Sequence, residues 1–511
     1  MWAISLCCAT MGLMKTITKI DPEKEYENAK KMIELATQKT LDVDNASSLD
    51  SSVDNLITVA RVLIEREERR RGPKKYPKEN KPKGRNKGEA RAETKKLPSE
   101  RYPDLEVKED VVRPDKNPTC PCCNKEMKES GLFDCSEKLE TIPQFFYILR
   151  TKRPKFNCGS CHGAMVNTPA PVSIIPSSNY GDSMIIDVAL TKYCDLLPIE
   201  RYVQIAARLG LVGLPAQSLV GLTHQLANFL RPVYELIKLE VLSSAVLRAD
   251  ETTHKMLEGD ETSQWYLWGF FSEAACYFET HGTRSGDVVI EFLKGSKTEV
   301  LMSDGYAAYS KAAKAIRKLG RELLEVHCNA HAVRYFKQAG ITWKEEVEPY
   351  LALYGEIYEL ESTRKEKKDE LSRDEQQELR SQMLPLFERI KELAEKDKEE
   401  AMAESGFKMA LNYFLNHYEG LTACSGNIDI PLDNNLAERE IRGPVVGRKT
   451  WYGTHSKKGA KTTAVLFSIV QSCKLNNVNP RSYFAWIVER LHRGESAVTP
   501  YSYSKLDPPS G

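Results

Sequence analysis

From about residue 245 onward, the sequence consists of short apolar runs in a fixed order. The runs AVLRAD, QWYLWGFF and ACYFETH are typical of three strands, and DVVIEFLKG of a helix. EVLMSDG then predicts a fourth strand, YSKAAKAIRKLG a second helix and LLEVHC a fifth strand. Three strands followed by alternating helix and strand predict an α/β fold, in which a mixed sheet is flanked by helices.

Two of these predicted strands end in an aspartate. Asp250 closes AVLRAD and Asp304 closes EVLMSD, and each is followed by polar or turn-forming residues. Carboxylates at the ends of neighbouring strands can meet at one point, and Mg²⁺ prefers such oxygen ligands. Two aspartates that merely occupy turns would give the same local pattern.

A third acidic ligand is expected on a helix beside these strands, and Glu438 in NNLAEREIR is the candidate. Asn434 and Asn435 are expected to cap this helix. Glu440 is the competing carboxylate and should lie on a different face of the helix. Two arginines close to Glu438 offer forked donors suited to phosphate, namely Arg439 and Arg442.

A basic and aromatic cluster follows the same helix at Arg448, Lys449, Trp451 and Tyr452. These residues could grip a DNA backbone and stack on an unpaired base. Packing of Trp451 in the core explains the pattern equally well.

Two CxxC pairs near residue 120 predict a zinc site. Four thiolates from two such pairs are the usual ligands of a closed tetrahedral Zn²⁺. They are Cys120, Cys123, Cys158 and Cys161. The gap between the pairs is long, so three further residues are possible substitutes: Cys122, Cys135 and His162. The alternative is four unrelated free cysteines.

The rest of the chain is divided by composition and periodicity. Residues 66–101 hold 15 Lys/Arg against 6 Glu, which favours a basic tether that can also contact phosphate. The segment ARLGLVGLPAQSLVGLTHQL has the pattern of a helix-turn-helix, although two core helices would look the same.

The chain is predicted to contain six segments. They are 1–71 helical, 72–104 disordered basic linker, 105–170 zinc-binding and DNA-binding, 186–245 helical, 246–475 catalytic with a helical insertion at about 332–425, and 476–511 C-terminal helix and tail.

Composition excludes several classes of protein. With 511 residues, 41% hydrophobic and 28% charged, the chain suits a multidomain globular protein, and no apolar run approaches the roughly 20 residues that span a bilayer. The apolar start lacks the basic flank and cleavage site of a secretory signal. Two CxxC pairs among scattered cysteines favour metal binding in a reducing cytoplasm, so a cytoplasmic location is expected. The net charge is only +1, so affinity for nucleic acid must come from local patches.

The motifs ADETTHKML, SDGYAAY, HCNAHAVRYF and DNNLAEREIRGPVVGRKTWYG resemble the catalytic signatures of insertion-sequence-66-type transposases. CPCC and CGSC resemble the zinc-binding domain of that family, and the similarity covers about residues 105–495. The resemblance implies a ribonuclease-H-like core of the DDE (Asp-Asp-Glu) class. Asp250 would be the first catalytic aspartate, Asp304 the second and Glu438 the glutamate.

The resemblance also extends to the segment after the second aspartate. The 134 residues between Asp304 and Glu438 (438 minus 304) fit a helical insertion. Cys328 and His331 match a CxxH element of transposases with such insertions. Structural support explains this pair better than a metal site does.

The function implied is that of a bacterial DNA transposase acting at the nucleoid. It would bind the terminal inverted repeats of an insertion sequence and cut and join DNA with two Mg²⁺ or Mn²⁺ ions, with Zn²⁺ as a structural metal. Expected partners are double-stranded DNA, further copies of the chain on paired ends and companion proteins from the same insertion sequence. The alternatives are a nuclease or resolvase that does not join DNA, and a non-catalytic DNA-binding protein.

Overall fold

The computed structural model describes residues 97–101, 103, 107–109, 122, 125, 136–139, 144–157, 165–257 and 264–506. The chain forms two compact units, one of residues 71–148 and the other of residues 1–70 and 149–511. The predicted N-terminal helices, most of the basic linker and the four candidate zinc ligands lie outside the described residues.

The unit of residues 71–148 contains the short helix α5 (Pro98–Arg101). The hydroxyl and backbone N–H of Ser99 both donate to the Glu137 carboxylate at 2.8 Å. In the larger unit, β1 (Lys155–Asn157) and β2 (Met165–Asn167) form an antiparallel hairpin.

Four helices precede the large sheet. They are α6 (Asp182–Tyr193), α7 (Ile199–Arg208), α8 (Ala216–Phe229) and α9 (Arg231–Leu242). The turn between α7 and α8 contains Gly210 and Gly213, whose φ values of 92° and 83° favour glycine. One face of α8 is buried through Leu219, Leu222 and Leu226. The predicted pair of helices and its turn are therefore present, and a DNA-reading role for them stays a prediction.

The central sheet has five strands in the order β5-β4-β3-β6-β7. The strands are β3 (Val246–Lys255), β4 (Gln264–Phe271), β5 (Cys276–His281), β6 (Val300–Ser303) and β7 (Leu324–His327). β3, β4 and β5 pair antiparallel, whereas β3, β6 and β7 pair parallel. This mixed sheet confirms the predicted fold class, because its order is that of a ribonuclease-H-like core.

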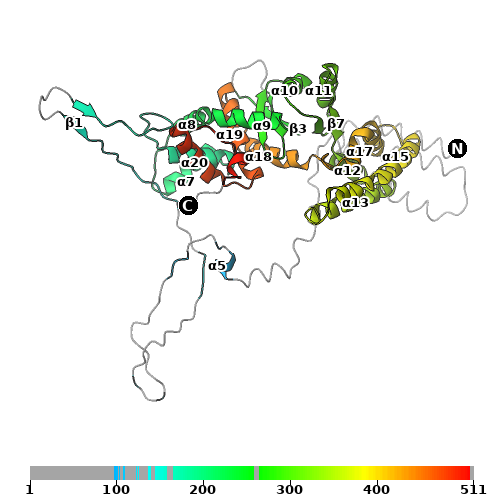
Figure 1. Cartoon of the computed structure of the whole chain (residues 1–511), viewed down its shortest axis with the longest axis horizontal. Helices are drawn as coiled ribbons and strands as arrows, with labels where there is room; N and C mark the ends of the chain where they lie inside the picture. The colour runs from blue at the N-terminus through cyan, green and yellow to red at the C-terminus, as the bar shows by residue number, and fades with distance from the viewer. Residues whose placement is uncertain are drawn as a thin grey trace, which may run out of the picture. The chain divides into compact units, whose positions relative to one another are not determined.

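Helices cover both faces of the sheet (Figure 1). α10 (Gly286–Lys294) and α11 (Ala307–Lys318) lie on one face, where Phe292 stacks on Phe270 at 3.8 Å and Tyr309 meets Trp268 edge to face. α18 (Asn435–Trp451) and α19 (Lys457–Leu475) lie on the other. There the Ser468 hydroxyl accepts a hydrogen bond from the Phe278 backbone N–H at 2.8 Å.

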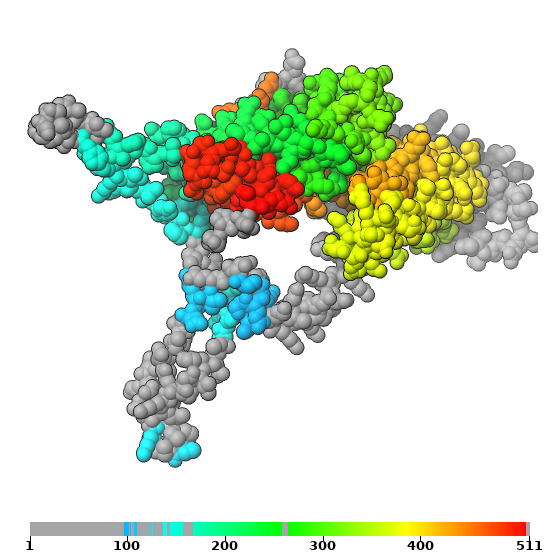
Figure 2. All heavy atoms as spheres, viewed as in Figure 1, coloured from blue at the N-terminus to red at the C-terminus, as the bar shows by residue number. Residues whose placement is uncertain are grey.

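A helical lobe is inserted between β7 and α18. Its helices gather beside β7 and appear in yellow and olive in Figures 1 and 2. They are α12 (Asn329–Ala339), α13 (Lys344–Glu366), α14 (Arg373–Ser381), α15 (Met383–Glu400), α16 (Gly406–Asn416) and α17 (Tyr418–Gly426). Their apolar faces form one core, in which Phe336, Tyr350 and Phe387 are fully buried.

A buried ion pair ties three parts of this lobe together. The Arg380 guanidinium donates to both carboxylate oxygens of Glu361, at 2.7 and 3.1 Å. Its remaining nitrogen donates to the carbonyl oxygens of Cys424 and Ile430. Burial alone would raise the pKa of Glu361, but hydrogen bonds and charge from Arg364 and Arg380 outweigh it and lower the pKa to about 2.

Two further helices close the larger unit, namely α20 (Pro480–His492) and α21 (Pro500–Tyr503). Asn479 caps α20 by accepting hydrogen bonds from the backbone N–H groups of Arg481 and Ser482. Among the described residues, no helix is both long enough and apolar enough to cross a membrane.

Candidate functional site

Asp250 lies within β3 and not at its end. The parallel pairing of β3 with β6 stops at Arg248, but antiparallel pairing with β4 continues to Lys255. The prediction that the strand ends at Asp250 is therefore wrong, because the hairpin partner β4 extends the strand through the polar residues that follow. Asp304 directly follows β6, so both aspartates lie just beyond the parallel ladder.

Side chains alternate between the two faces of β3. Arg448 of α18 donates to the Thr252 hydroxyl at 3.0 Å, which places Thr252 and Asp250 on the face covered by α18. Glu251 lies on the opposite face, where it accepts hydrogen bonds from Tyr309 of α11 and from Arg284. Asp250 thus faces the helix that carries Glu438.

Asp304 is held by its own turn and by the helical lobe. Its side chain accepts a hydrogen bond from the Tyr306 backbone N–H at 2.9 Å. The Tyr413 hydroxyl of α16 donates to its carbonyl oxygen at 2.8 Å. Gly305 follows with φ of 87°, and a Cβ there would stand 3.0 Å from the His417 ring. The turn therefore favours glycine and brings Asp304 against the lobe.

Glu438 lies in the first turn of α18, and Asn434 fixes the start of this helix. Asn434 occupies the N-cap position of α18, as predicted, but its side chain makes no capping hydrogen bond to the helix. Its amide instead donates to the Ala249 carbonyl at 3.1 Å, one residue before Asp250. Its backbone N–H donates to the Cys328 sulfur at 3.1 Å. The bond to Ala249 joins the start of α18 to β3, and the bond to Cys328 joins it to the start of α12.

The charges at this site repel one another. Burial raises the pKa of Asp250 to about 8, and the negative charges of Glu251, Asp304 and Glu438 add to the rise. A hydrogen bond from the Glu251 backbone N–H opposes it only in part. Asp250 on β3 thus feels the negative charges of Asp304 at the β6 end and of Glu438 on α18. A divalent cation would offset this repulsion, and oxygen donors suit Mg²⁺.

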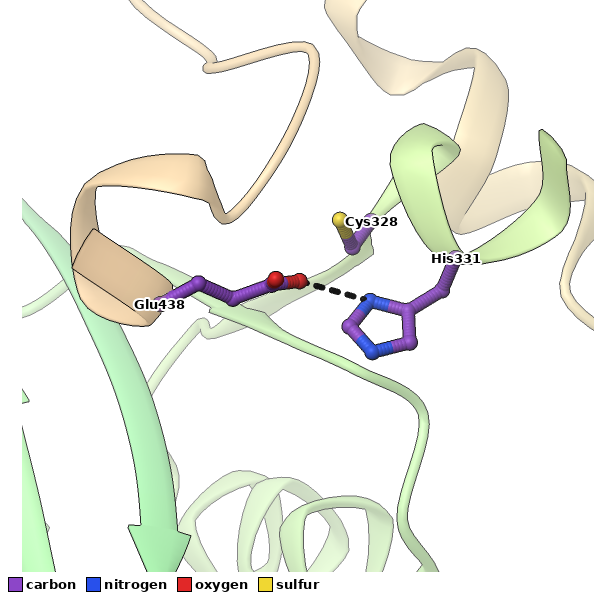
Figure 3. A group of neighbouring side chains, drawn as sticks. All are labelled: Cys328, His331 and Glu438. Atoms are coloured by element: carbon purple, nitrogen blue, oxygen red, sulfur yellow. Dashed lines mark ion pairs between the residues drawn. The ribbon is translucent and has the colours of Figure 1, made fainter. Parts of the chain in front are cut away.

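Glu438 is also contacted by the helical lobe, as Figure 3 shows for His331 of α12. Their closest atoms, His331 Nδ1 and Glu438 Oε1, are 3.4 Å apart. Arg334 donates to both oxygens of Glu438, at 3.0 and 3.2 Å, and to Nε2 of His331 at 3.0 Å. Because arginine only donates, Nε2 accepts, and the neutral ring carries its proton on Nδ1 toward Glu438.

Cys328, His331 and Glu438 could themselves hold a metal ion, since one ligand atom of each lies within 4.8 Å of the others. The state of the thiol favours structural support instead. Cys328 is fully buried within the core of the lobe, and burial raises the pKa of its thiol to about 12. The sulfur already accepts the Asn434 N–H. The CxxH element thus anchors α18 through the cysteine and touches Glu438 through the histidine.

The candidate DNA-binding residues divide into two groups. Arg442 and Lys449 are exposed, and Arg439 is exposed with its Nε donating to Glu440 at 2.8 Å. Glu440 itself is buried away from Glu438, as expected for the other helix face. Arg448 is tied to β3 through Thr252 and Thr253.

Trp451 packs between Tyr193 and Phe467, at centroid distances of 6.2 and 6.4 Å, in agreement with the core-packing alternative. The neighbouring Tyr452 is 71% exposed. Its φ of 66° ends α18 in the left-handed region. Of these two rings, Tyr452 is the one available to a ligand.

Sequence reasoning missed Arg334 and Tyr413. Arg334 stands three residues after His331 within HAVRYF, so helical spacing placed it on the same face. Nothing in the sequence indicates that Tyr413, 109 residues after Asp304, bonds to the carbonyl of that aspartate.

The sheet order and the inserted lobe define a ribonuclease-H-like protein of the DDE class. Comparison with known families agrees: residues 177–462 match the model described as "Transposase IS66 family". The chain belongs to the IS66 family of transposases. Residues 117–162 match the zinc-finger binding domain of that family, a range that includes all four candidate zinc ligands.

Curated relatives share this similarity over most of their length. Uncharacterized protein y4hP of Sinorhizobium fredii (strain NBRC 101917 / NGR234) is 27% identical over 415 residues, which cover 76% of this chain and 73% of the relative. Uncharacterized protein y4qI of the same strain is 28% identical over 410 residues, with the same coverage of both chains.

Proposed function

We propose that this IS66 family transposase binds the terminal inverted repeats of its insertion sequence and cuts and joins DNA. Asp250, Asp304 and Glu438 would be the catalytic metal ligands. The observation that carries the proposal is that Asp250 and Asp304 lie just beyond the parallel ladder of β3 and β6, and that Asp250 faces the helix that carries Glu438. Burial raises the pKa of Asp250 to about 8, and the charges of Glu251, Asp304 and Glu438 add to the rise. A buried carboxyl whose pKa is raised by burial and by neighbouring carboxylates is common at functional sites.

Two Mg²⁺ or Mn²⁺ ions, when bound, would activate the attacking oxygen and stabilise the leaving oxygen of the phosphodiester. The chain would supply the rest. Asp250 and Asp304 hold two ligand positions on the rigid sheet, and Asn434 sets the start of the helix that brings Glu438. The exposed Arg439, Arg442 and Lys449 of α18 would contact DNA phosphates, as would Arg448 on release from β3. Trp451 would support this surface by packing beneath it.

The products formed from duplexes carrying the element's own terminal repeats test this function. In Mg²⁺ the wild type should nick these ends and join them to a second DNA, whereas a nuclease or resolvase would leave cleavage products alone. Glu438→Gln should bind the same duplexes and yield neither product. Equal cleavage by wild type and Glu438→Gln would exclude the proposed site. If wild type and Glu438→Gln bind the duplexes equally and neither cuts them, the alternative of a non-catalytic DNA-binding protein is favoured.

The second proposed metal is a structural Zn²⁺ held by Cys120, Cys123, Cys158 and Cys161. The match of this segment to the zinc-finger domain supports it. We expect one zinc per chain by elemental analysis, and Cys158→Ser should lower both the zinc content and the affinity for terminal-repeat DNA. Cys122→Ser should keep the full zinc content, and a loss of zinc in this variant would instead assign Cys122, an exposed cysteine outside any disulfide, to the ligand set. Full zinc content in Cys158→Ser would contradict the assignment.

We propose that the active form is a homo-oligomer on paired DNA ends, helped by companion proteins of the same insertion sequence. Family membership supports the DNA partner. Bridging of two end duplexes in one complex, measured by the mass of the complex in solution, would establish the oligomer.

A further inference from the structure

The helical lobe contains a cavity of about 530 Å³ between α12 and α13, next to the start of α18. Ligand sites in proteins commonly measure roughly 300–1,000 Å³. Two lining residues place this cavity beside Glu438. Arg334 lines the cavity and also donates to Glu438, and Asn435 lies three residues before Glu438 on α18. A ligand here would therefore lie beside the proposed catalytic carboxylate.

The walls of the cavity are apolar and aromatic. Val333 and Leu351 pack against the lobe core from the two helices, and the partly buried ring of Tyr358 contributes the aromatic surface, with Tyr354 buried behind it. Aromatic and aliphatic walls of this kind accept the flat face of any of the four nucleobases. Gly355 leaves the wall open, because a Cβ there would meet no atom within 4 Å.

Polar groups stand at defined places around these walls. Arg334 and Lys337, one turn apart on α12, are both exposed and bring two positive charges to the cavity. The Tyr358 hydroxyl is buried and has no hydrogen-bond partner among the residues that the structure describes. A buried donor without a partner is costly, which favours a ligand that accepts its hydrogen bond.

We propose that this cavity receives one unpaired nucleotide of the DNA bound at the catalytic site. The base lies against the apolar and tyrosine wall, and its phosphate is held by Arg334 and Lys337. A paired base cannot enter, because its edges remain bonded to the opposite strand within the stack. The inference rests on the proposed function for the identity of the DNA, and it assigns to the helical lobe a direct role in holding the substrate.

The test compares two duplexes, one fully paired and one with a single unpaired 5-iododeoxyuridine, on the full-length protein. The wild type should bind the unpaired form more tightly, by roughly 5- to 150-fold for one stacked base. Irradiation should crosslink the iodinated base to peptides of α12 or α13. Equal affinity for the two duplexes, or crosslinks only outside these helices, would overturn the proposal.

Gly355→Leu adds a side chain to the wall of the cavity at a position where a Cβ would meet no atom within 4 Å, and it replaces glycine by a better helix former, so the lobe should remain folded. This variant should lose the preference for the unpaired form and keep its affinity for the paired duplex. Gly426→Leu is the matched control: it also meets no atom within 4 Å but does not line the cavity, and it should keep the preference. An unchanged preference in Gly355→Leu would overturn the proposal.

The same variants separate this inference from the proposed function. If wild type cuts terminal-repeat DNA while Gly355→Leu discriminates as wild type does, the cavity proposal fails and the function stands. If wild type cuts no DNA but Gly355→Leu still abolishes discrimination, the proposed function fails and the nucleotide site stands. Binding of free deoxyadenosine monophosphate as tightly as the unpaired duplex would instead make this a site for free nucleotides and overturn the assignment to DNA.

Discussion

Asp250→Asn should reduce Mg²⁺-dependent cleavage by at least about 100-fold, since even groups that only orient a metal ligand typically contribute roughly 10- to 100-fold. The same substitution should stabilise the protein when no Mg²⁺ is added. Where Asp250 is ionised, the substitution removes a buried charge that is repelled by Glu251, Asp304 and Glu438. A gain in stability that accompanies a loss of activity distinguishes a ligand site from ordinary structural damage.

The stability that Asp250 contributes to the folded protein should depend on pH. Folding raises the pKa of Asp250 from 3.8 to about 8, so the folded state holds the proton more tightly. Its contribution to stability is complete below about pH 4 and is lost as the pH rises toward 8. Without added Mg²⁺, the melting temperature of wild type should therefore fall relative to that of Asp250→Asn between pH 6 and pH 8.

Addition of Mg²⁺ should reverse this order at pH 8, because a ligand that binds only the folded state stabilises it. Wild type should gain stability, and Asp250→Asn should gain little. Asp374→Asn, an exposed aspartate on α14, is the control and should behave as wild type in both assays. A wild-type melting temperature that changes with neither pH nor Mg²⁺ would contradict the assignment of Asp250 to a metal site.

Glu361→Gln should destabilise the helical lobe by about 3–5 kcal/mol, the usual effect of removing one partner of a buried ion pair. Both side chains are almost fully buried, with 4% of Glu361 and 1% of Arg380 exposed. The substitution leaves the Arg380 charge without its carboxylate. Urea unfolding followed by circular dichroism, together with hydrogen exchange of peptides from α13 and α14, measures the loss.

The matched control for this prediction is Glu392→Gln. Glu392 pairs with Arg389 on the surface, with 67% and 61% of the two side chains exposed, so its removal should change stability by less than about 1 kcal/mol. The Glu361 pair should also weaken in acid. Its folded pKa is about 2 against 4.5 in the free residue, so its contribution is present above about pH 4.5 and is lost as the pH falls toward 2. Equal stability of both variants would exclude the predicted role of the pair.

The order of strands was predictable because each strand has its own local signal. Apolar runs such as VLMS of β6 have the strand period, and an intervening helix implies a parallel crossover. The end of β3 was not predictable in the same way. DETTHK is polar, and it remains extended because Gln264–Phe271 pairs along it, which is a property of the partner strand.

The candidate carboxylates were likewise visible in the sequence, but their surroundings were not. Asp250, Asp304 and Glu438 stand in recognisable motifs. Asn434 resembles a helix cap in the sequence, yet its amide bonds to Ala249, 185 residues earlier. Contacts over such distances depend on how helices and sheet pack in space, and a local pattern cannot report them.

The cavity beside α13 also depends on packing between helices, which a local sequence pattern does not report. Tyr354, Gly355 and Tyr358 give only a mixed pattern within a helix, and the space that they enclose exists only because α12 lies opposite them. Gly355 could be noted as an unfavourable helix residue, but its open surroundings appear only in the structure.

The insertion of the lobe between β7 and α18 has a consequence for synthesis on the ribosome. Glu438 emerges 188 residues after Asp250 (438 minus 250), and α18 must dock across β3 after the whole lobe has been made. Closing so long a loop is slow relative to forming the local hairpin of β3 and β4. At a synthesis rate of roughly 5–20 residues per second, a nascent chain would therefore carry Asp250 and Asp304 for on the order of ten seconds before Glu438 can join them.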